Sequence, residues 1–129
     1  MTVELTMLAL SIVLGIVYIV LSASSATGER GLDWNAGPRD EPKPPLSGVA
    51  GRLDRALRNF FETFPLFAAA VLIAHAANRH SALTVWGAHL YFWGRVAYLP
   101  LYAMGIPRIR TLAWAVATLG IILILIALI

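Results

Sequence analysis

Arginine, asparagine and glutamate recur at helical spacing within one partly apolar stretch of the sequence. The four residues are Arg52, Arg55, Asn59 and Glu62, separated by steps of three, four and three. At about 100° per residue, these steps place all four on one narrow face of a helix. Guanidinium groups bind carboxylates as planar forks, and a glutamate can hold an ammonium or amide N–H. The face therefore suits a small zwitterionic or polyanionic ligand.

A second stripe of polar side chains follows about thirty residues later. It consists of Tyr91, Arg95, Tyr98 and Tyr102, at steps of four, three and four, again one face of a helix. Arg108 and Arg110 follow it. Arginines beside a helix end favour the thiolate form of a bound thiol, because a nearby positive charge stabilises the anion. The two stripes together could therefore bind a small thiol with several polar groups.

Each of these residues also has a simpler interpretation. Glu62 and Arg95 could form an intramembrane ion pair that only fixes helix register. Tyr98 and Tyr102 could lie at the headgroup level, where tyrosine is common, and Arg108 and Arg110 could only enforce topology. We leave these alternatives open at this stage.

The amino-acid composition indicates which class of protein contains these two polar helix faces. Of the 129 residues, 59% are hydrophobic and 13% are charged, and the mean hydropathy is +0.75. Soluble domains have about 45–50% apolar and about 25% charged residues. These values exclude a soluble globular enzyme, a disordered tail and a nucleic-acid-binding module. The sequence has no cysteine, and its histidines lack metal-ligand spacing, so we predict no metal site.

Four apolar segments are each close to the roughly 20 residues that cross a bilayer as a helix. They cover about residues 5–23, 60–77, 83–104 and 112–129. The first is not a typical signal peptide, since Glu4 stands where a basic residue belongs. We predict an all-α, four-helix transmembrane bundle in a single domain, 1–129. A long Gly- and Pro-rich surface loop is expected at 24–51, and residues 105–111 are expected to form a turn.

Basic residues are distributed unequally between the connecting segments. The first and third connections, with the polar segment before the second span, hold eight of them: Arg30, Arg39, Lys43, Arg52, Arg55, Arg58, Arg108 and Arg110. The other side has Arg79 alone. The positive-inside rule therefore predicts an integral membrane protein with both termini outside the cytoplasm.

Three short motifs resemble the MAPEG family, the membrane-associated proteins of eicosanoid and glutathione metabolism. Arg55-x-x-x-Asn59-x-x-Glu62-x-x-Pro65 resembles one family motif. Arg95-x-x-Tyr98-x-x-x-Tyr102, followed by the 106–111 segment, resembles another. The segment 37–42 is similar to the first loop of a bacterial branch, which implies a bacterial inner membrane.

The resemblance implies a homotrimer that binds glutathione as cosubstrate between neighbouring subunits, at the cytoplasmic side. The residues implied to hold glutathione are Arg55, Asn59, Glu62, Arg95, Tyr98 and Tyr102. Either Arg110 or Arg108 would stabilise the thiolate, with Arg110 the better match. Thr63 departs from members that have a tyrosine after the glutamate.

The function expected from this resemblance is a glutathione-dependent transferase or peroxidase, acting on a lipophilic small molecule that arrives from the bilayer. A non-catalytic, ligand-binding membrane scaffold is the alternative. A small four-helix transporter fits less well, because such proteins need an acidic residue midway along the first span and this span has none.

Overall fold

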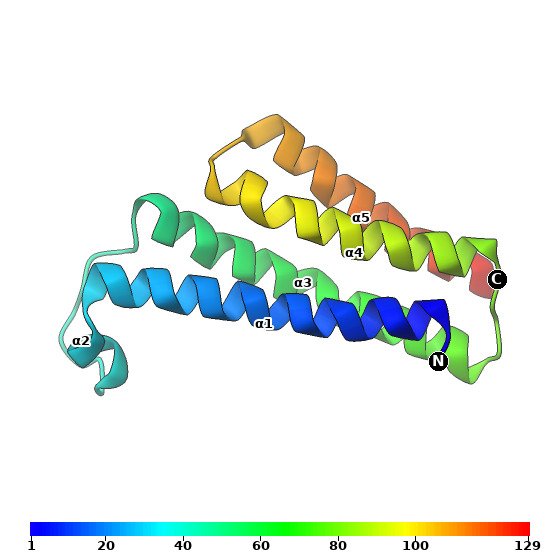
Figure 1. Ribbon diagram of the computed structural model, residues 1–129, viewed down its shortest axis with the longest axis horizontal. Helices are drawn as coiled ribbons and strands as arrows, with labels where there is room; N and C mark the ends of the chain where they lie inside the picture. Colours follow the sequence, from blue (N-terminus) through cyan, green and yellow to red (C-terminus); the bar gives the residue numbers. More distant parts are fainter.

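The computed structural model describes residues 1–129 as helices joined by short connections, without a strand. The elements are α1 (Val3–Arg30), α2 (Leu32–Ala36), α3 (Gly48–Ala76), α4 (Ala82–Ala103) and α5 (Pro107–Leu128). Figure 1 shows the four long helices running side by side, with both termini at one end and α2 at the other. The predicted all-α bundle is confirmed, and the short α2 is added to it.

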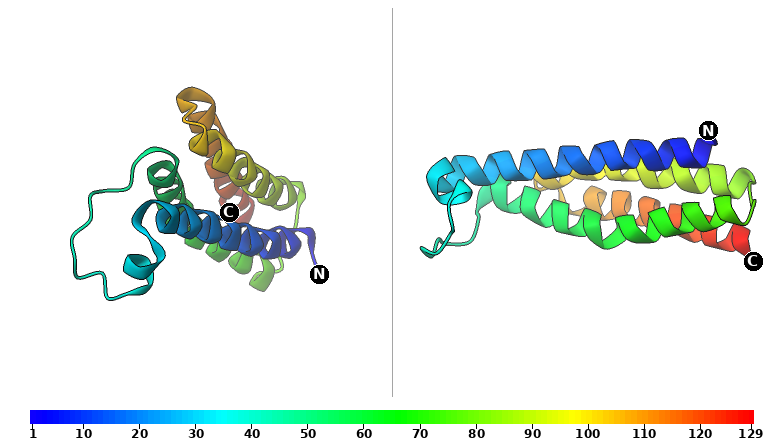
Figure 2. Two further views of the ribbon diagram at one scale, coloured as in Figure 1. Left: turned by 60° about the vertical axis from the view of Figure 1, so that its left-hand side comes forward. Right: turned by 90° about the horizontal axis from the view of Figure 1, so that it is seen from below.

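Three of the helices, α1, α3 and α5, are long and apolar enough to cross a membrane. The fourth long helix, α4, has 22 residues, as many as α5. It carries Arg95 and three tyrosines, which make it less apolar. Seen from two further directions, α4 still lies alongside the other long helices (Figure 2). Tyr91, Arg95 and Tyr98 are buried, so this part of its polar face is turned into the bundle.

The prediction of a loop over 24–51 is wrong at both of its ends. The first helix continues to Arg30, because residues 22–27 contain no proline and Gly31, at φ 91°, is the first residue to leave helical geometry. The segment without helix is 37–47, and four of its residues are proline, which opposes helix formation. Trp34 of α2 holds this segment in place. Its indole Nε1 donates to the Glu41 carbonyl oxygen at 2.7 Å. The guanidinium groups of Arg30 and Arg39 lie over the Trp34 ring.

The last connection is also shorter than expected. The predicted turn over 105–111 ends at Ile106, and α5 begins at Pro107. Proline is favoured in the first helical position, since its fixed φ suits a helix and its missing N–H would have no partner there. As a result, Arg108 and Arg110 lie in the first turn of α5 rather than in a flexible connection.

The two C-terminal helices pack at very short range through glycines. A Cβ on Gly87 of α4 would lie 2.5 Å from the carbonyl oxygen of Gly120 on α5. A larger residue there would collide with backbone, which cannot move without separating the helices. Small residues at such crossings are typical of membrane helices, where close backbone approach provides packing. This contact fixes the rotation of α5, and with it the direction of its arginines.

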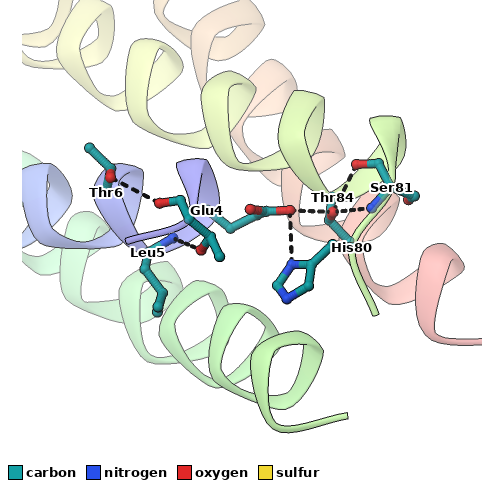
Figure 3. A network of polar contacts seen from close by, with 7 residues as sticks. Glu4, Leu5, Thr6, His80, Ser81 and Thr84 are labelled. Carbon is teal, nitrogen blue, oxygen red and sulfur yellow. Dashed lines mark hydrogen bonds and ion pairs between the residues drawn. The ribbon is translucent and has the colours of Figure 1, made fainter. Parts of the chain in front are cut away.

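Glu4 closes the end of the bundle that carries the termini. Its side chain is 4% exposed, and Oε1 accepts a hydrogen bond from the Thr84 hydroxyl at 2.6 Å. His80 Nδ1 lies 3.3 Å from the same oxygen. Figure 3 shows the carboxylate of α1 pointing to the beginning of α4, where these partners lie. The network joins the first helix to the α3–α4 connection.

Candidate functional site

A pocket of about 400 Å³ opens between α3, α4 and α5, at the end of the bundle opposite the termini. Nine residues line it: Arg55, Arg58, Asn59, Glu62, Tyr98, Tyr102, Arg110, Thr111 and Trp114. Three helices contribute to the lining, so the pocket exists only in the folded bundle. Six of the eight predicted site residues are in this set.

On α3, the predicted stripe divides into pocket residues and one structural residue. Arg55, Asn59 and Glu62 line the pocket, and Arg55 Nε donates to the Tyr102 hydroxyl at 3.1 Å. Arg52 turns away instead, and its Nε donates to the Ala103 carbonyl oxygen at 2.9 Å. It thereby satisfies a carbonyl at the end of α4 that has no partner within the helix. Arg52 is therefore part of the scaffold.

On α4, only the two tyrosines nearer the C-terminal end of the helix reach the pocket. The rings of Tyr98 and Tyr102 meet edge to face at 5.5 Å between centroids. Tyr91 is fully buried further along the helix and stacks on Phe67. The hydroxyls of Tyr91 and Thr63 lie 3.0 Å apart, so Thr63 faces the core. The hydroxyls available to a ligand are those of Tyr98 and Tyr102.

Arg95 does not line the pocket but lies directly behind it. The residue is 0% exposed, and its Nη1 donates to Asn59 Oδ1 at 2.8 Å. Its guanidinium carbon is 4.2 Å from the ring centroid of Tyr98 and 5.5 Å from that of Phe60. Such ring faces stabilise a cation that has left water. The Nε and Nη2 atoms of Arg95 have no hydrogen-bond partner.

The hydrogen bond from Arg95 determines what Asn59 can offer to a ligand. Arginine has no acceptor, so the asparagine oxygen must face it. The Asn59 amide nitrogen is then the group that remains for the pocket, as a donor. The alternative ion pair between Glu62 and Arg95 does not form: Asp54–Arg58 and Glu4–His80 are the two acid–base pairs with N···O distances within 4.0 Å. Glu62 is exposed and free to bind a ligand group.

On α5, the structure separates the two candidate arginines. Arg110 lines the pocket, and its guanidinium carbon lies 4.4 Å from the Tyr102 ring centroid. Arg108 is exposed and is not among the lining residues. Two residues along a helix correspond to about 200° of rotation, so the two side chains point in nearly opposite directions. The geometry favours Arg110 for any contact with a ligand.

The comparison with known families gives one match. The sequence profile of the MAPEG family covers residues 7–129, which is nearly the whole chain. The chain belongs to the MAPEG family. Comparison with curated proteins gave no match, and neither did comparison with solved structures. MAPEG proteins are helical membrane proteins, and the family includes glutathione-dependent transferases and peroxidases as well as non-catalytic members.

Three lining residues of this MAPEG protein were absent from the predicted site. Arg58 was interpreted as a topology residue; it lines the pocket and also pairs with Asp54, at 3.1 Å, on the exposed side of α3. Thr111 and Trp114 follow Arg110 by one and four residues on α5. The spacing of four would have indicated Trp114, because residues four apart share a helix face. Nothing in the spacing indicates Thr111.

The pocket of the MAPEG protein is electropositive. Three arginines line it against one glutamate. Arg110 is half-buried, so its charge is screened less by solvent than those of the exposed Arg55 and Arg58. The arrangement favours a ligand with more negative than positive groups, bound through arginine forks, the Asn59 amide donor and tyrosine hydroxyls.

Proposed function

We propose that this protein is a glutathione-dependent membrane transferase or peroxidase that acts on lipophilic electrophiles. The observation that carries the proposal is the convergence of Arg55, Asn59 and Glu62 of α3 with Arg110 of α5 on one pocket, although the two helices are far apart in the sequence. Membership of a family that contains glutathione-dependent enzymes supports the choice of thiol.

The groups of glutathione match the lining residues in kind and in number. The tripeptide has two carboxylates, one ammonium, two amides and a thiol. The guanidinium groups of Arg55 and Arg58 can each bind a carboxylate through two hydrogen bonds, and Glu62 is the one acidic residue of the lining that can bind the ammonium. The Asn59 amide nitrogen can donate to a ligand carbonyl or carboxylate oxygen. This leaves Arg110 for the thiol.

In the proposed reaction, Arg110 stabilises the thiolate and so raises the fraction of the reactive form. The sulfur electron pair forms a bond to an electrophilic carbon, while the leaving group departs with the electrons of the bond that breaks. With a peroxide, sulfur attacks one oxygen, the O–O bond breaks, and the departing alkoxide takes a proton from water. A second glutathione then reduces the sulfenic acid, giving disulfide and water.

The lipophilic substrate would arrive from the bilayer beside α5. Trp114 is the large apolar residue of the pocket lining, four residues further along α5 than Arg110, or about 6 Å further along the helix axis. In the proposed topology, α4 is the third of four spans, although it is less apolar than the other three, and both basic connections are cytoplasmic. The termini are outside the cytoplasm, in a bacterial inner membrane. The thiol is then at the membrane edge and the apolar wall lies toward the lipid.

We also propose a homotrimer, as the family resemblance implies. Arg55, Arg58 and Glu62 are exposed although they line the pocket, so a neighbouring subunit could cover them. Burial of this side would strengthen each charged contact, because water would be excluded.

The first test measures thermal unfolding of the detergent-purified protein with increasing glutathione. The control ligand is the same tripeptide with a methyl group in place of the thiol. At 100 times its dissociation constant, a ligand specific for the folded state stabilises by about 2.7 kcal/mol. We expect glutathione to raise Tm more than the methyl analogue. Conjugation and peroxidase assays then define the reaction. Equal shifts would refute thiolate recognition, and no shift would refute the glutathione site.

A non-catalytic ligand-binding protein is the second candidate, and Thr63 favours it. Members with a tyrosine after the glutamate have an aromatic side chain there, whereas Thr63 is buried and bonded to Tyr91. Thr63 does not line the pocket, so position 63 supplies no aromatic contact to a ligand there. Binding of glutathione without turnover on any electrophile would support this candidate over the enzyme.

A further inference from the structure

A second cavity lies on the outer faces of α4 and α5, in the half of the bundle nearer the termini. It measures about 450 Å³ and is lined by Val85, Trp86, His89, Leu90, Trp93 and Val116. None of these residues lines the arginine pocket. Five of the six are hydrophobic and one is a histidine. We call it the His89 groove.

The His89 groove faces away from the protein core. Trp86 and Trp93 are 64% and 57% exposed, although both are large and apolar. They belong to the bundle of apolar helices, so the medium that meets them is the hydrocarbon of the bilayer. A histidine at such a position is costly without a partner, and polar residues within membrane spans mark functional sites by default.

One hydrogen bond fixes the tautomer of His89. Trp93 Nε1 lies 3.3 Å from His89 Nδ1, and an indole nitrogen can only donate. His89 Nδ1 is therefore the acceptor, and the proton of the neutral ring is on Nε2. No residue of the chain accepts a hydrogen bond from Nε2. The groove thus presents one N–H donor between two indole rings, in a medium that offers no water.

The depth of His89 restricts which lipid group could accept that hydrogen bond. His89 is seven residues from Ala82, the first residue of α4, which corresponds to about 10 Å along the helix axis. With the third span predicted to begin near residue 83, the ester carbonyls of phospholipids at the membrane interface lie about 9 Å from His89 along the helix axis. The acceptor must belong to a molecule whose polar group enters the hydrocarbon together with its apolar part.

We infer that the His89 groove binds a lipid-soluble quinone, a flat ring with carbonyl oxygens. A ring carbonyl accepts the Nε2–H of His89, and the exposed faces of Trp86 and Trp93 stack on the ring. Val85, Leu90 and Val116 contact the apolar tail. The inference concerns binding only and does not depend on the glutathione pocket, which lies toward the opposite end of the bundle.

Quenching of indole fluorescence tests this site directly. The full-length protein, with Trp34→Phe and Trp114→Phe so that Trp86 and Trp93 report, is placed in phosphatidylcholine nanodiscs. A benzoquinone with one isoprenoid unit is then titrated. We expect saturable quenching, with a midpoint raised at least tenfold in His89→Phe, which keeps a ring but lacks the donor. His89→Gln, which has an amide donor, should restore most of the affinity.

The control is His75→Phe, since His75 is an exposed histidine of α3 outside the groove; its midpoint should equal that of the parent. Quenching that rises linearly with quinone, or an equal midpoint in His89→Phe, would overturn the site. The same holds if brominated acyl chains fail to quench Trp86 and Trp93, because a second copy of the chain would then cover the groove. A glutathione-induced shift in Tm, measured on His89→Phe with all four tryptophans retained, reports the arginine pocket separately, because Trp114 lines that pocket.

Discussion

Polar side chains gather at both ends of the bundle, but they meet different surroundings. Near the termini, the Glu4 carboxylate is 4% exposed, and its partners Thr84 and His80 belong to the same chain (Figure 3). Near the basic connections, Arg110 and Glu62 face a pocket of about 400 Å³, and Glu62 has no ion-pair or hydrogen-bond partner in the chain. Buried polar groups need partners. The first set is satisfied by folding, whereas the second is left available to a ligand.

The Asn59–Arg95 hydrogen bond joins a buried polar group of the core to a residue of the ligand pocket. Arg95 is as buried as Glu4 and depends on Asn59 for its hydrogen bond, yet Asn59 also lines the pocket. Folding and ligand binding therefore share one side chain. Substitutions at the two ends should therefore differ in whether they change stability, the response to ligand, or both.

The largest effect is expected from Arg110→Gln. Removing one group that stabilises developing or resident negative charge typically lowers kcat about 100- to 1,000-fold, and we expect a loss of this size in glutathione conjugation. Thermal unfolding should change little, because Arg110 has no ion-pair partner in the chain and its contact with the Tyr102 ring contributes at most about 1 kcal/mol. Arg108→Gln, two residues away and outside the pocket, is the matched control. Equal losses in the two variants would contradict the assignment.

Asn59→Leu is expected to lower both stability and ligand response. It leaves the buried Arg95 guanidinium without its hydrogen-bond acceptor, at a cost of about 2–3 kcal/mol in the free energy of unfolding. Chemical denaturation in detergent measures this loss. Asn59→Asp keeps an acceptor for Arg95 and should remain stable, while its added charge weakens binding of an anionic ligand. Wild-type stability in Asn59→Leu would show that Arg95 does not depend on Asn59.

A smaller, purely functional effect is expected from Glu62→Gln. The substitution removes the one acidic group of the pocket, so glutathione should bind about tenfold more weakly, equivalent to about 1.4 kcal/mol. Titration by thermal shift measures the affinity. N-acetylated glutathione, which lacks the ammonium, should bind both proteins equally. If Glu62→Gln lowered the affinity for both ligands alike, Glu62 would not bind the ammonium group.

The smallest effect is expected from Glu4→Gln. Its amide oxygen can still accept from the Thr84 hydroxyl, whose single proton can otherwise be donated to the Ser81 carbonyl oxygen at 2.9 Å, so the loss of stability should stay below about 1 kcal/mol. The ligand-induced shift in Tm should equal that of the wild type. A changed glutathione response would mean that the two ends are coupled, contrary to the comparison.

The sequence alone was sufficient for the all-α fold and for the two polar stripes. Both follow from helical periodicity, because residues three and four apart share a face whatever the helix packs against. The long helices were located within a few residues at most of their ends. The errors lie at 24–30, 48–51 and 107–111, which are helical although their glycines, serines and prolines are typical of turns.

What each polar residue contacts was decided by tertiary structure. Arg52 and Arg55 share a predicted face, yet one binds the Ala103 carbonyl at the end of α4 and the other lines the pocket. Arg95 matches a binding motif but lies behind Asn59. The choice between Arg108 and Arg110 depends on the rotation of α5, which its close contact with α4 at Gly87 and Gly120 sets. Periodicity places residues on a face, and only the packing of neighbouring helices decides what that face meets.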